Sequence, residues 1–497
     1  MKTANNVKNW IADRIRPEEI EKYLDNGKDF MDHDLIESCL EPKPAPDKAQ
    51  LQDILDKSLS VTTLLPQETA ALLRVEDPDH LALMQETALE VKKKVYDNRI
   101  VTFAPLYMSD LCVNNCLYCG FRTDNKNMTR RRLSMDEVAK EVEVLAGQIG
   151  HKRLIVVYGE HPKSGVDYIA DTISTVYGLK FPTRKGYGSI RRVNVNAAPL
   201  QIDELRKLRE VGIGTFQVFQ ETYHRPTYEY VHPKNTLKGN YLWRLYCMHR
   251  AMEAGVDDVG IGVLFGLYEW KYEVMALLLH SRELEAKFGI GPHTISFPRI
   301  EPAENTPYAS KPKRKVDDAD FLKLVSILRL SVPHTGMIVT CREGAKLKDK
   351  CLEIGCTQTD SSSQIGIGGY SELGNVQESK RQQFMLGDTR SLDEMIHDLA
   401  KKGCITSFCT AGYRCGRTGK CIMDMLRSGH EGKFCKLNAV ITYREWLDDF
   451  ASEETLRAGE KVIQEEIQQI KETMPKAYPQ FIENYNRTVN GERDIYF

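Results

Sequence analysis

The sequence predicts a closed (βα)8 barrel with a helical extension at each end. From residue 101 onward, short apolar or β-branched runs alternate with amphipathic runs of helical length, and this alternation favours parallel strands. Eight such units favour closure, because an open, doubly wound sheet of eight strands would be unusually wide. The chain of 497 residues is also long enough for a barrel with appendages.

Residues 1–95 are expected to form a helical prelude that packs on the barrel. Residues 10–23 and 47–73 have apolar side chains at helical spacing, with acidic and proline signals near the helix starts. Pro66 is expected to split the second segment into two helices. The proline-rich run 41–46 is typical of a linker.

The barrel itself is expected at residues 96–385. The predicted strands cover residues 101–108, 153–158, 192–197, 215–220, 258–265, 294–298, 337–341 and 356–359. The predicted helices cover residues 135–146, 165–176, 202–211, 241–254, 271–288, 317–330, 345–354 and 377–385. Residues 386–497 form a C-terminal extension, because the alternation breaks there, a second group of thiols appears, and helix returns over residues 443–473.

Composition argues against several classes of protein. The formal net charge is −2, so no global basic field points to nucleic acid or a membrane surface. Every long apolar stretch is interrupted by charge, which argues against a transmembrane span, and residues 1–13 do not resemble a secretory signal. Several of the 13 cysteines occur in groups, which is typical of an intracellular metal-binding protein rather than a disulfide-linked one, and we expect an anaerobic or strongly reducing cytoplasm.

Three thiols follow the first predicted strand. Cys112, Cys116 and Cys119 have the spacing C-x3-C-x2-C. Three thiolates can hold three irons of a 4Fe-4S cubane and leave the fourth iron open. A zinc loop or a chance grouping is the alternative, but zinc would need a fourth Cys or His nearby, and none follows Cys119 closely.

This spacing, with Tyr118 just before the last thiol, resembles the signature of the radical S-adenosylmethionine (SAM) enzymes. The resemblance implies that the open iron is chelated by the amino and carboxylate groups of SAM. It also implies that electron transfer cleaves SAM to methionine and a 5′-deoxyadenosyl radical. Tyr118 joins the candidates for cofactor binding.

Polar residues follow the next two strands. Gly159 would let the backbone approach a ligand, and Glu160 can accept hydrogen bonds from an ammonium group. The resemblance implies that this acid binds the SAM amino group, whereas an ordinary solvated acid is the alternative. Asn194 and Asn196 point to one side of the third strand. The resemblance makes Asn196 a candidate near the SAM ribose, and a satisfied polar layer is an equally good interpretation.

Six runs make the resemblance more specific: residues 112–122, 191–199, 219–225, 251–267, 291–303 and 409–419. They resemble the HydG family, the tyrosine lyases that mature FeFe-hydrogenase, and more distantly the ThiH family of 2-iminoacetate synthases. The resemblance implies a full (βα)8 barrel, hydrogen abstraction from the amino group of tyrosine, and Cα–Cβ cleavage to dehydroglycine and p-cresol. It also implies reduced ferredoxin or flavodoxin as the electron donor.

Such a substrate needs a cation for its carboxylate and a closed, apolar pocket for its ring. Arg342, after the seventh strand, matches the family's carboxylate-binding arginine. A surface arginine paired with Glu343 is the alternative. His280, on the helix after the fifth strand, matches the family's iron-binding histidine, although a lone histidine on a helix is more often structural.

The second thiol group departs from the family. HydG enzymes hold a second cluster on a C-x2-C-x22-C motif, where carbon monoxide and cyanide are made. Here Cys409 and Cys435 match the outer thiols and Gly412 takes the middle position, so a cubane would bind poorly. Cys415 and Cys421 could complete a four-thiol cluster or zinc site without an open iron, or the site could be metal-free.

The sequence therefore predicts a HydG-like lyase with tyrosine as the first-choice substrate and with doubtful carbon monoxide and cyanide formation. The family's Ser-Arg is replaced by Ser363-Gln364, which could change the substrate. One alternative is a radical lyase that acts on another amino acid or amine. The other is a non-catalytic, metal-binding homologue.

Overall fold

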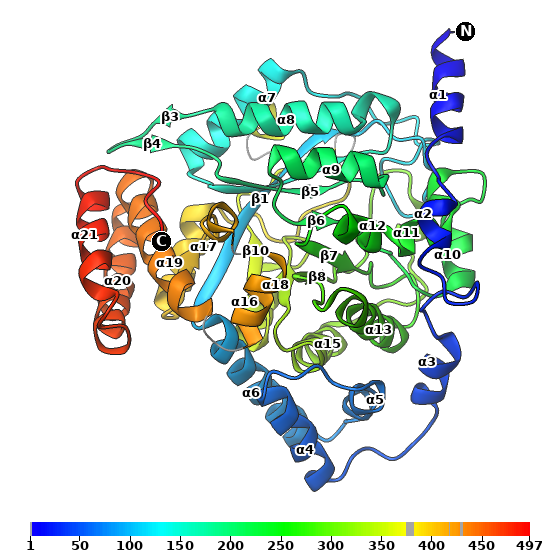
Figure 1. The fold of residues 1–497 in the computed structure, drawn as a ribbon, viewed down its shortest axis with the longest axis horizontal. Coiled ribbons are helices and arrows are strands. Elements are labelled where there is room, and N and C mark those ends of the chain that lie inside the picture. The colour runs from blue at the N-terminus through cyan, green and yellow to red at the C-terminus, as the bar shows by residue number, and fades with distance from the viewer. Residues whose placement is uncertain (1, 374–381, 417, 428–430) are drawn as a thin grey trace.

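A closed barrel of eight parallel strands forms the centre of the computed structural model, which describes residues 2–373, 382–416, 418–427 and 431–497 (Figure 1). Each strand pairs with the next, and the last pairs with the first through Val101 and Gln358. The predicted (βα)8 fold is confirmed. The barrel strands are β1 (Arg99–Ser109), β2 (Arg153–Tyr158), β5 (Arg192–Asn196), β6 (Phe216–Gln217), β7 (Val259–Gly262), β8 (Thr294–Ser296), β9 (Gly336–Val339) and β10 (Gln358–Asp360).

Helices cover the outside of the barrel, largely where the amphipathic pattern predicts them. Ser134 starts the first of them with a capping box, in which its side chain and that of Glu137 bond each other's backbone N–H groups. These helices are α7 (Met135–Val142), α8 (Val166–Gly178), α9 (Ile202–Val211), α11 (Tyr241–Leu245), α12 (Cys247–Glu253), α13 (Trp270–Phe288), α15 (Asp318–Ser331) and α16 (Ala345–Ile354). The short elements β3 (Phe181–Pro182), β4 (Tyr187–Gly188), α10 (Arg225–Val231) and α14 (Pro307–Ser310) lie in the loops.

Three predicted helices differ from the structure. The first continues beyond α7 as a π-helix over Glu143–Ile149. The fourth is broken into α11 and α12 at the buried Tyr246, whose ring stacks on Tyr23 with centroids 5.6 Å apart. The eighth, at residues 377–385, falls mostly outside the described residues, and its described part, 382–385, is not helical.

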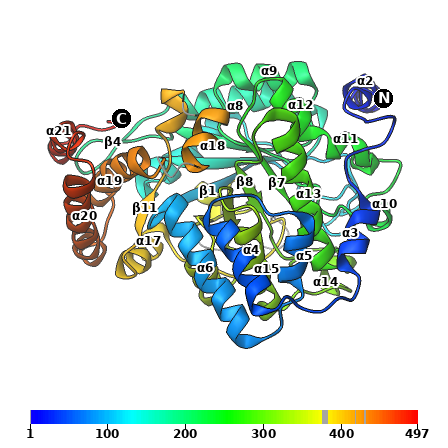
Figure 2. The same ribbon diagram turned by 60° about the horizontal axis from the view of Figure 1, so that its bottom comes forward.

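The N-terminal prelude is helical, as expected, and shares one hydrophobic core with the barrel. Pro66 begins the second helix of its segment, as predicted. Helix α6 lies along α15, while α3 and α5 lie against α13 (Figure 2). The prelude helices are α1 (Lys2–Ala12), α2 (Glu18–Glu21), α3 (His33–Leu40), α4 (Lys48–Leu59), α5 (Pro66–Leu73) and α6 (Pro78–Tyr96).

The C-terminal extension has a hydrophobic core of its own, which includes the fully buried Trp446. Strand β11 pairs with the N-terminal end of β1, opposite residues 99–101, so the extension covers that end of the barrel. Its elements are α17 (Leu392–Lys401), β11 (Ile405–Ser407), α18 (Gly419–Arg427), α19 (Glu431–Asp449), α20 (Glu453–Thr473) and α21 (Tyr478–Val489). No described helix is long and apolar enough to cross a membrane.

Candidate active site

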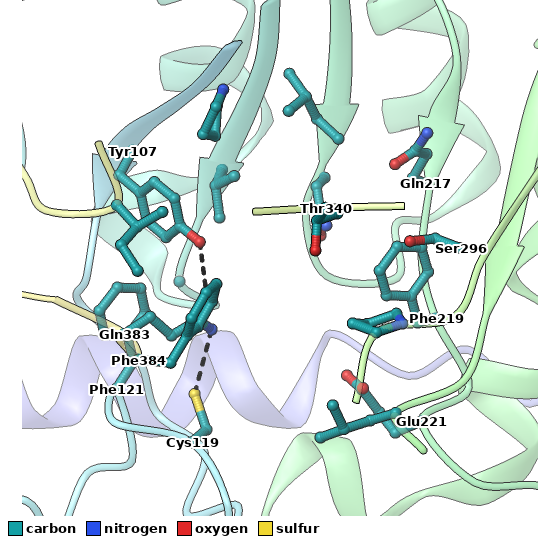
Figure 3. A pocket seen from close by; sticks show the side chains of 18 of the residues that line it. Tyr107, Cys119, Phe121, Gln217, Phe219, Glu221, Ser296, Thr340, Gln383 and Phe384 are labelled. Carbon is teal, nitrogen blue, oxygen red and sulfur yellow. Dashed lines mark hydrogen bonds between the residues drawn. The ribbon is translucent and has the colours of Figure 1, made fainter. Parts of the chain in front are cut away.

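The C-terminal ends of the barrel strands surround a cavity of about 240 Å³, called here the upper cavity (Figure 3). Side chains from loops far apart in the sequence meet there because parallel strands present all their C-terminal ends at one face. The upper cavity brings together every candidate that the sequence places at this face: Cys112, Cys116, Tyr118, Cys119, Gly159, Glu160, Asn196 and Arg342.

The three thiols of the first loop line this cavity, and none of the three is in a disulfide. Two side-chain amides donate to their sulfurs. Asn114 Nδ2 donates to Cys112 Sγ at 3.8 Å. Gln383 Nε2 donates to Cys119 Sγ at 3.5 Å, and Figure 3 shows this second contact. Such N–H donors stabilise the negative charge of cluster-bound sulfur.

Burial raises the pKa of the Cys112 thiol to about 11 and that of Cys116 to about 12, and the neighbouring thiol Cys119 adds to both shifts. Metal binding would therefore release protons from these groups. In the described part of the chain, no three His, Cys, Asp or Glu side chains form a group that could hold a metal ion. A cubane differs from a single ion because it spreads three thiolates over three irons, so the donor set fits a cluster by its chemistry.

Glu160 lies beside the Cys loop, at the end of β2. Its Oε2 accepts from Asn114 Nδ2 at 2.5 Å, and its carbonyl accepts from Val113 N at 2.8 Å. Burial raises the pKa of this carboxyl group. No lysine or arginine within 4.0 Å pairs with Glu160 among the described residues, so its carboxylate can receive an ammonium group from the cavity.

Gly159 lines the upper cavity and packs closely against the Cys loop. A Cβ at this position would lie 2.3 Å from the Leu111 carbonyl oxygen. The glycine is therefore required by the close packing of the Cys loop on β2.

The two asparagines of β5 differ in their partners. Asn194 Oδ1 accepts from Arg192 Nε at 3.2 Å and from Thr215 N at 3.0 Å, so this side chain belongs to a satisfied polar layer. Asn196 is half-buried and lines the upper cavity. Tyr118 is buried, and its hydroxyl is 2.8 Å from His232 Nε2.

Arg342 lines the cavity and is not paired with Glu343. Its guanidinium carbon lies 3.4 Å from the centroid of the Phe384 ring. Glu343 instead accepts from Arg299 Nε at 3.1 Å, which overturns the surface-pair interpretation. Among the described residues Arg342 has no hydrogen bond or ion pair, and burial lowers its pKa.

The cavity also holds residues that the sequence did not single out as site residues. Glu221 has a φ of +72° and pairs with Lys238 Nζ at 2.7 Å and Arg244 Nη2 at 3.3 Å. In the sequence, Glu221 lies in the run 219–225, which is rich in hydrogen-bond donors and acceptors and follows the fourth predicted strand. Glu301 also lines the cavity, and only its position after β8 indicated it.

Apolar side chains form much of the remaining wall. Phe103, Ile155 and Ile338 make a small hydrophobic cluster of their own inside the barrel, and all three line the cavity. Phe219 and Phe384 face it from loops (Figure 3). The combination of an apolar wall with a few charged groups is typical of a pocket for a small molecule.

A second, smaller cavity lies at the N-terminal ends of the strands, and we call it the lower cavity. Cys409 and Cys435 line it together with Gly412 and His293. Arg192 Nη1 donates to the Cys409 carbonyl at 2.9 Å and to its sulfur at 3.2 Å.

The other residues proposed for this second site lie elsewhere. Cys415 and Cys421 are exposed and do not line the lower cavity. His280 is buried on α13, where its Nδ1 is 2.7 Å from the Tyr223 hydroxyl. His293, which directly precedes β8, lines the lower cavity together with Cys409 and Cys435. It was not among the site residues expected from the sequence, although its position at the start of a strand could have indicated it.

Comparison with known proteins gives consistent similarities. Residues 106–279 match the radical SAM superfamily, and residues 296–405 match the biotin and thiamin synthesis associated domain. A crystal structure of HydG, a maturase of the FeFe-hydrogenase, shares 45% identity with a TM-score of 0.88, covering 94% of this chain and 100% of that one.

Two further proteins are similar to this chain over most of its length. The FeFe-hydrogenase maturase HydG from Carboxydothermus hydrogenoformans shares 34% identity with a TM-score of 0.73, over 89% of this chain and 94% of that one. The 2-iminoacetate synthase of Salmonella typhimurium is 26% identical over 351 residues, which is 70% of this chain and 88% of the relative.

Proposed function

The chain belongs to the HydG family of the radical SAM superfamily, and on that premise we propose that it cleaves the Cα–Cβ bond of tyrosine to dehydroglycine and p-cresol. Membership makes the protein a radical SAM lyase that uses a 4Fe-4S cluster and SAM, and that acts on a small amino-acid substrate. Tyrosine and these products are the proposed part.

One observation supports this proposal above the others. The three thiols, the carboxylate of Glu160 and the guanidinium of Arg342 line one apolar-walled cavity, and Arg342 has no ion pair among the described residues. When bound, the cluster and SAM supply the electron and the 5′-deoxyadenosyl radical that begin radical SAM chemistry. The protein's own part is to bind, orient and enclose the reacting molecules.

We assign the following roles to the side chains. Cys112, Cys116 and Cys119 would hold three irons. Glu160 would bind the SAM amino group, with Asn114 keeping its carboxylate in place. The proposed neighbours of SAM are Tyr118, Gly159 and Asn196, and Arg342 would bind the substrate carboxylate. Reduced ferredoxin or flavodoxin is the proposed electron donor.

The lower cavity does not fit the second cluster of the family. It provides two thiols, one fewer than the three thiolates that such a cluster needs. We therefore propose that the reaction ends at dehydroglycine, without carbon monoxide or cyanide.

We also propose a division of the chain into three parts. Residues 1–95 form the N-terminal helical prelude, residues 96–385 the catalytic barrel, and residues 386–497 the C-terminal extension.

Anaerobic product analysis tests the proposal. The reconstituted protein is incubated with SAM, a reductant and each amino acid of a panel. With tyrosine, p-cresol and glyoxylate from hydrolysed dehydroglycine should appear in equal amounts. SAM cleavage that depends on another amino acid, without p-cresol, would identify a different substrate. Absence of SAM cleavage with every amino acid would indicate a non-catalytic homologue.

A further inference from the structure

Two side chains of opposite charge in the upper cavity, Arg342 and Glu301, have no hydrogen-bond or ion-pair partner among the described residues. Arg342 follows β9, and Glu301 follows the neighbouring strand β8. Both line the cavity. Among the described residues, neither side chain has a hydrogen bond, and no nitrogen–oxygen pair within 4.0 Å joins either one to another residue.

The surrounding charges explain why these two remain unpaired. Arg299 could have neutralised Glu301, but its guanidinium is bonded to Glu343 and to Asp318 Oδ1, the latter at 2.9 Å. Glu221, the other acid within electrostatic range of Arg342, is bonded to Lys238 instead. The protein thus leaves one cation and one anion open to the same space.

Leaving charges half-buried and unpaired costs free energy, which a ligand with complementary charges recovers. Burial raises the pKa of Glu301 and the nearby Glu343 raises it further, whereas the charges of Arg342, Arg299 and Lys315 lower it. A bound cation would favour the ionised carboxylate in the same way. Glu301 and Arg342 do not pair with each other although both line the cavity, so a molecule that carries both charges can contact each of them.

We propose that Glu301 binds the α-ammonium group of the substrate while Arg342 binds its carboxylate, so that the pair selects free α-amino acids. This inference rests on the proposed function, because it concerns the same cavity. It deepens that function by assigning a group that recognises the amine. Amines without a carboxylate and acids without an amine would each leave one buried charge unpaired.

The test compares Glu301→Gln with the wild-type protein and with Glu304→Gln. Glu304 belongs to the same loop but does not line the cavity, so it provides a matched control. Three ligands are compared: tyrosine, tyramine, which lacks the carboxylate, and 3-(4-hydroxyphenyl)propionate, which lacks the amine. Binding to the cluster-loaded protein is measured by anaerobic equilibrium dialysis, alongside KM and kcat for SAM cleavage.

Glu301→Gln should weaken tyrosine binding and raise its KM by roughly 10- to 100-fold, the loss expected for a charge-assisted hydrogen bond. It should leave binding of the propionate unchanged, and Glu304→Gln should behave as wild type. Unchanged tyrosine binding would overturn the proposal. Equal losses for tyrosine and the propionate would overturn it too, since they would indicate a structural role.

The same design separates this inference from the choice of tyrosine. If another amino acid supports SAM cleavage in the wild type, the comparison is repeated with that amino acid and its deaminated analogue. If Glu301→Gln then weakened binding of the new amino acid but not of its deaminated analogue, the role of Glu301 would be supported, and tyrosine would be rejected as the substrate. Equal binding by Glu301→Gln and wild type would overturn the role of Glu301 alone.

Discussion

The residues that line the upper cavity differ in how their charges are satisfied. Glu221 is neutralised by Lys238 and Arg244. Glu160 has only an amide donor, and Arg342 has none among the described residues. Buried polar groups are normally paired, so the exceptions mark the positions where ligands are expected.

Loss of one thiol should remove the cluster. Cys116→Ala is expected to abolish 5′-deoxyadenosine formation and to reduce the iron content from about four atoms per chain to near zero. Iron analysis and chromatography of the SAM products measure both effects. The control is Cys404→Ala, which removes a half-buried thiol outside both cavities. Retained cleavage by Cys116→Ala would refute the assignment.

A buried carboxyl group next to the site should make stability depend on pH. Glu273 accepts from the Thr222 hydroxyl and from Tyr223 N at 2.9 Å, and so holds the chain just after Glu221. Burial raises its pKa from 4.5 to about 7. The folded state then binds the proton more tightly than the unfolded state, so this group lowers stability as pH rises from 4.5 to 7 and has a constant effect above that.

Glu273→Gln should therefore gain stability relative to wild type between pH 4.5 and 8, by at most about 3 kcal/mol. Urea unfolding at pH 5 and pH 8 measures the difference. Glu210→Gln, an exposed change on α9, should show no such gain. If the free energies of unfolding of wild type and Glu273→Gln differed by the same amount at pH 5 and pH 8, the raised pKa would be contradicted.

At the scale of elements, the Cys loop is held by its fit against β2. Gly159 provides that fit, because a Cβ there would overlap the Leu111 carbonyl oxygen. The loop is also tied through Thr123 N, which donates to the Asn114 carbonyl at 2.8 Å. The position of the thiols thus depends on a neighbouring strand as much as on their own spacing.

Gly159→Ala should displace the Cys loop, at a cost of about 1–3 kcal/mol in the free energy of unfolding. The expected result is a protein that folds but reconstitutes with less iron than wild type. Gly178→Ala, at the end of α8, adds a Cβ with no atom within 4 Å and provides the control. Equal iron content in the two variants would show that the loop tolerates the added atom.

The sequence predicted the barrel well because its signals were local. Runs of β-branched residues placed the strand starts, and Pro66 placed a helix break. Breaks caused by tertiary contacts could not be seen: Tyr246 interrupts its helix where its ring packs on the prelude. The same limit applies to the site. Barrel topology gathered the strand-end candidates, but only the three-dimensional packing separates His280 from the thiols and brings His293 to them.

At the scale of the whole molecule, the two ends of the barrel are used differently. The upper cavity is built by loops of the barrel itself, whereas the lower cavity is closed by the C-terminal extension. The extension contributes Cys409 and Cys435 and has a separate hydrophobic core. Its covering role does not require a metal, and two thiols are one fewer than a three-thiol cluster site needs.

Iron content tests this division between the two ends. The reconstituted wild-type protein should bind about four irons per chain, because the upper cavity is lined by three thiols and the lower cavity, among the described residues, by two. Cys409→Ala should leave that value unchanged. A value of about eight irons, falling to about four in Cys409→Ala, would show that the lower cavity holds a second cluster.

The central claim is that three thiols at the mouth of the barrel hold a cluster whose open iron binds SAM. The most direct measurement is reductive SAM cleavage by the anaerobically reconstituted full chain, with Cys116→Ala measured in parallel. We predict 5′-deoxyadenosine and methionine in equal amounts from the wild type and none from the variant. A wild-type protein that carries about four irons but forms no 5′-deoxyadenosine with any amino acid present would contradict the claim.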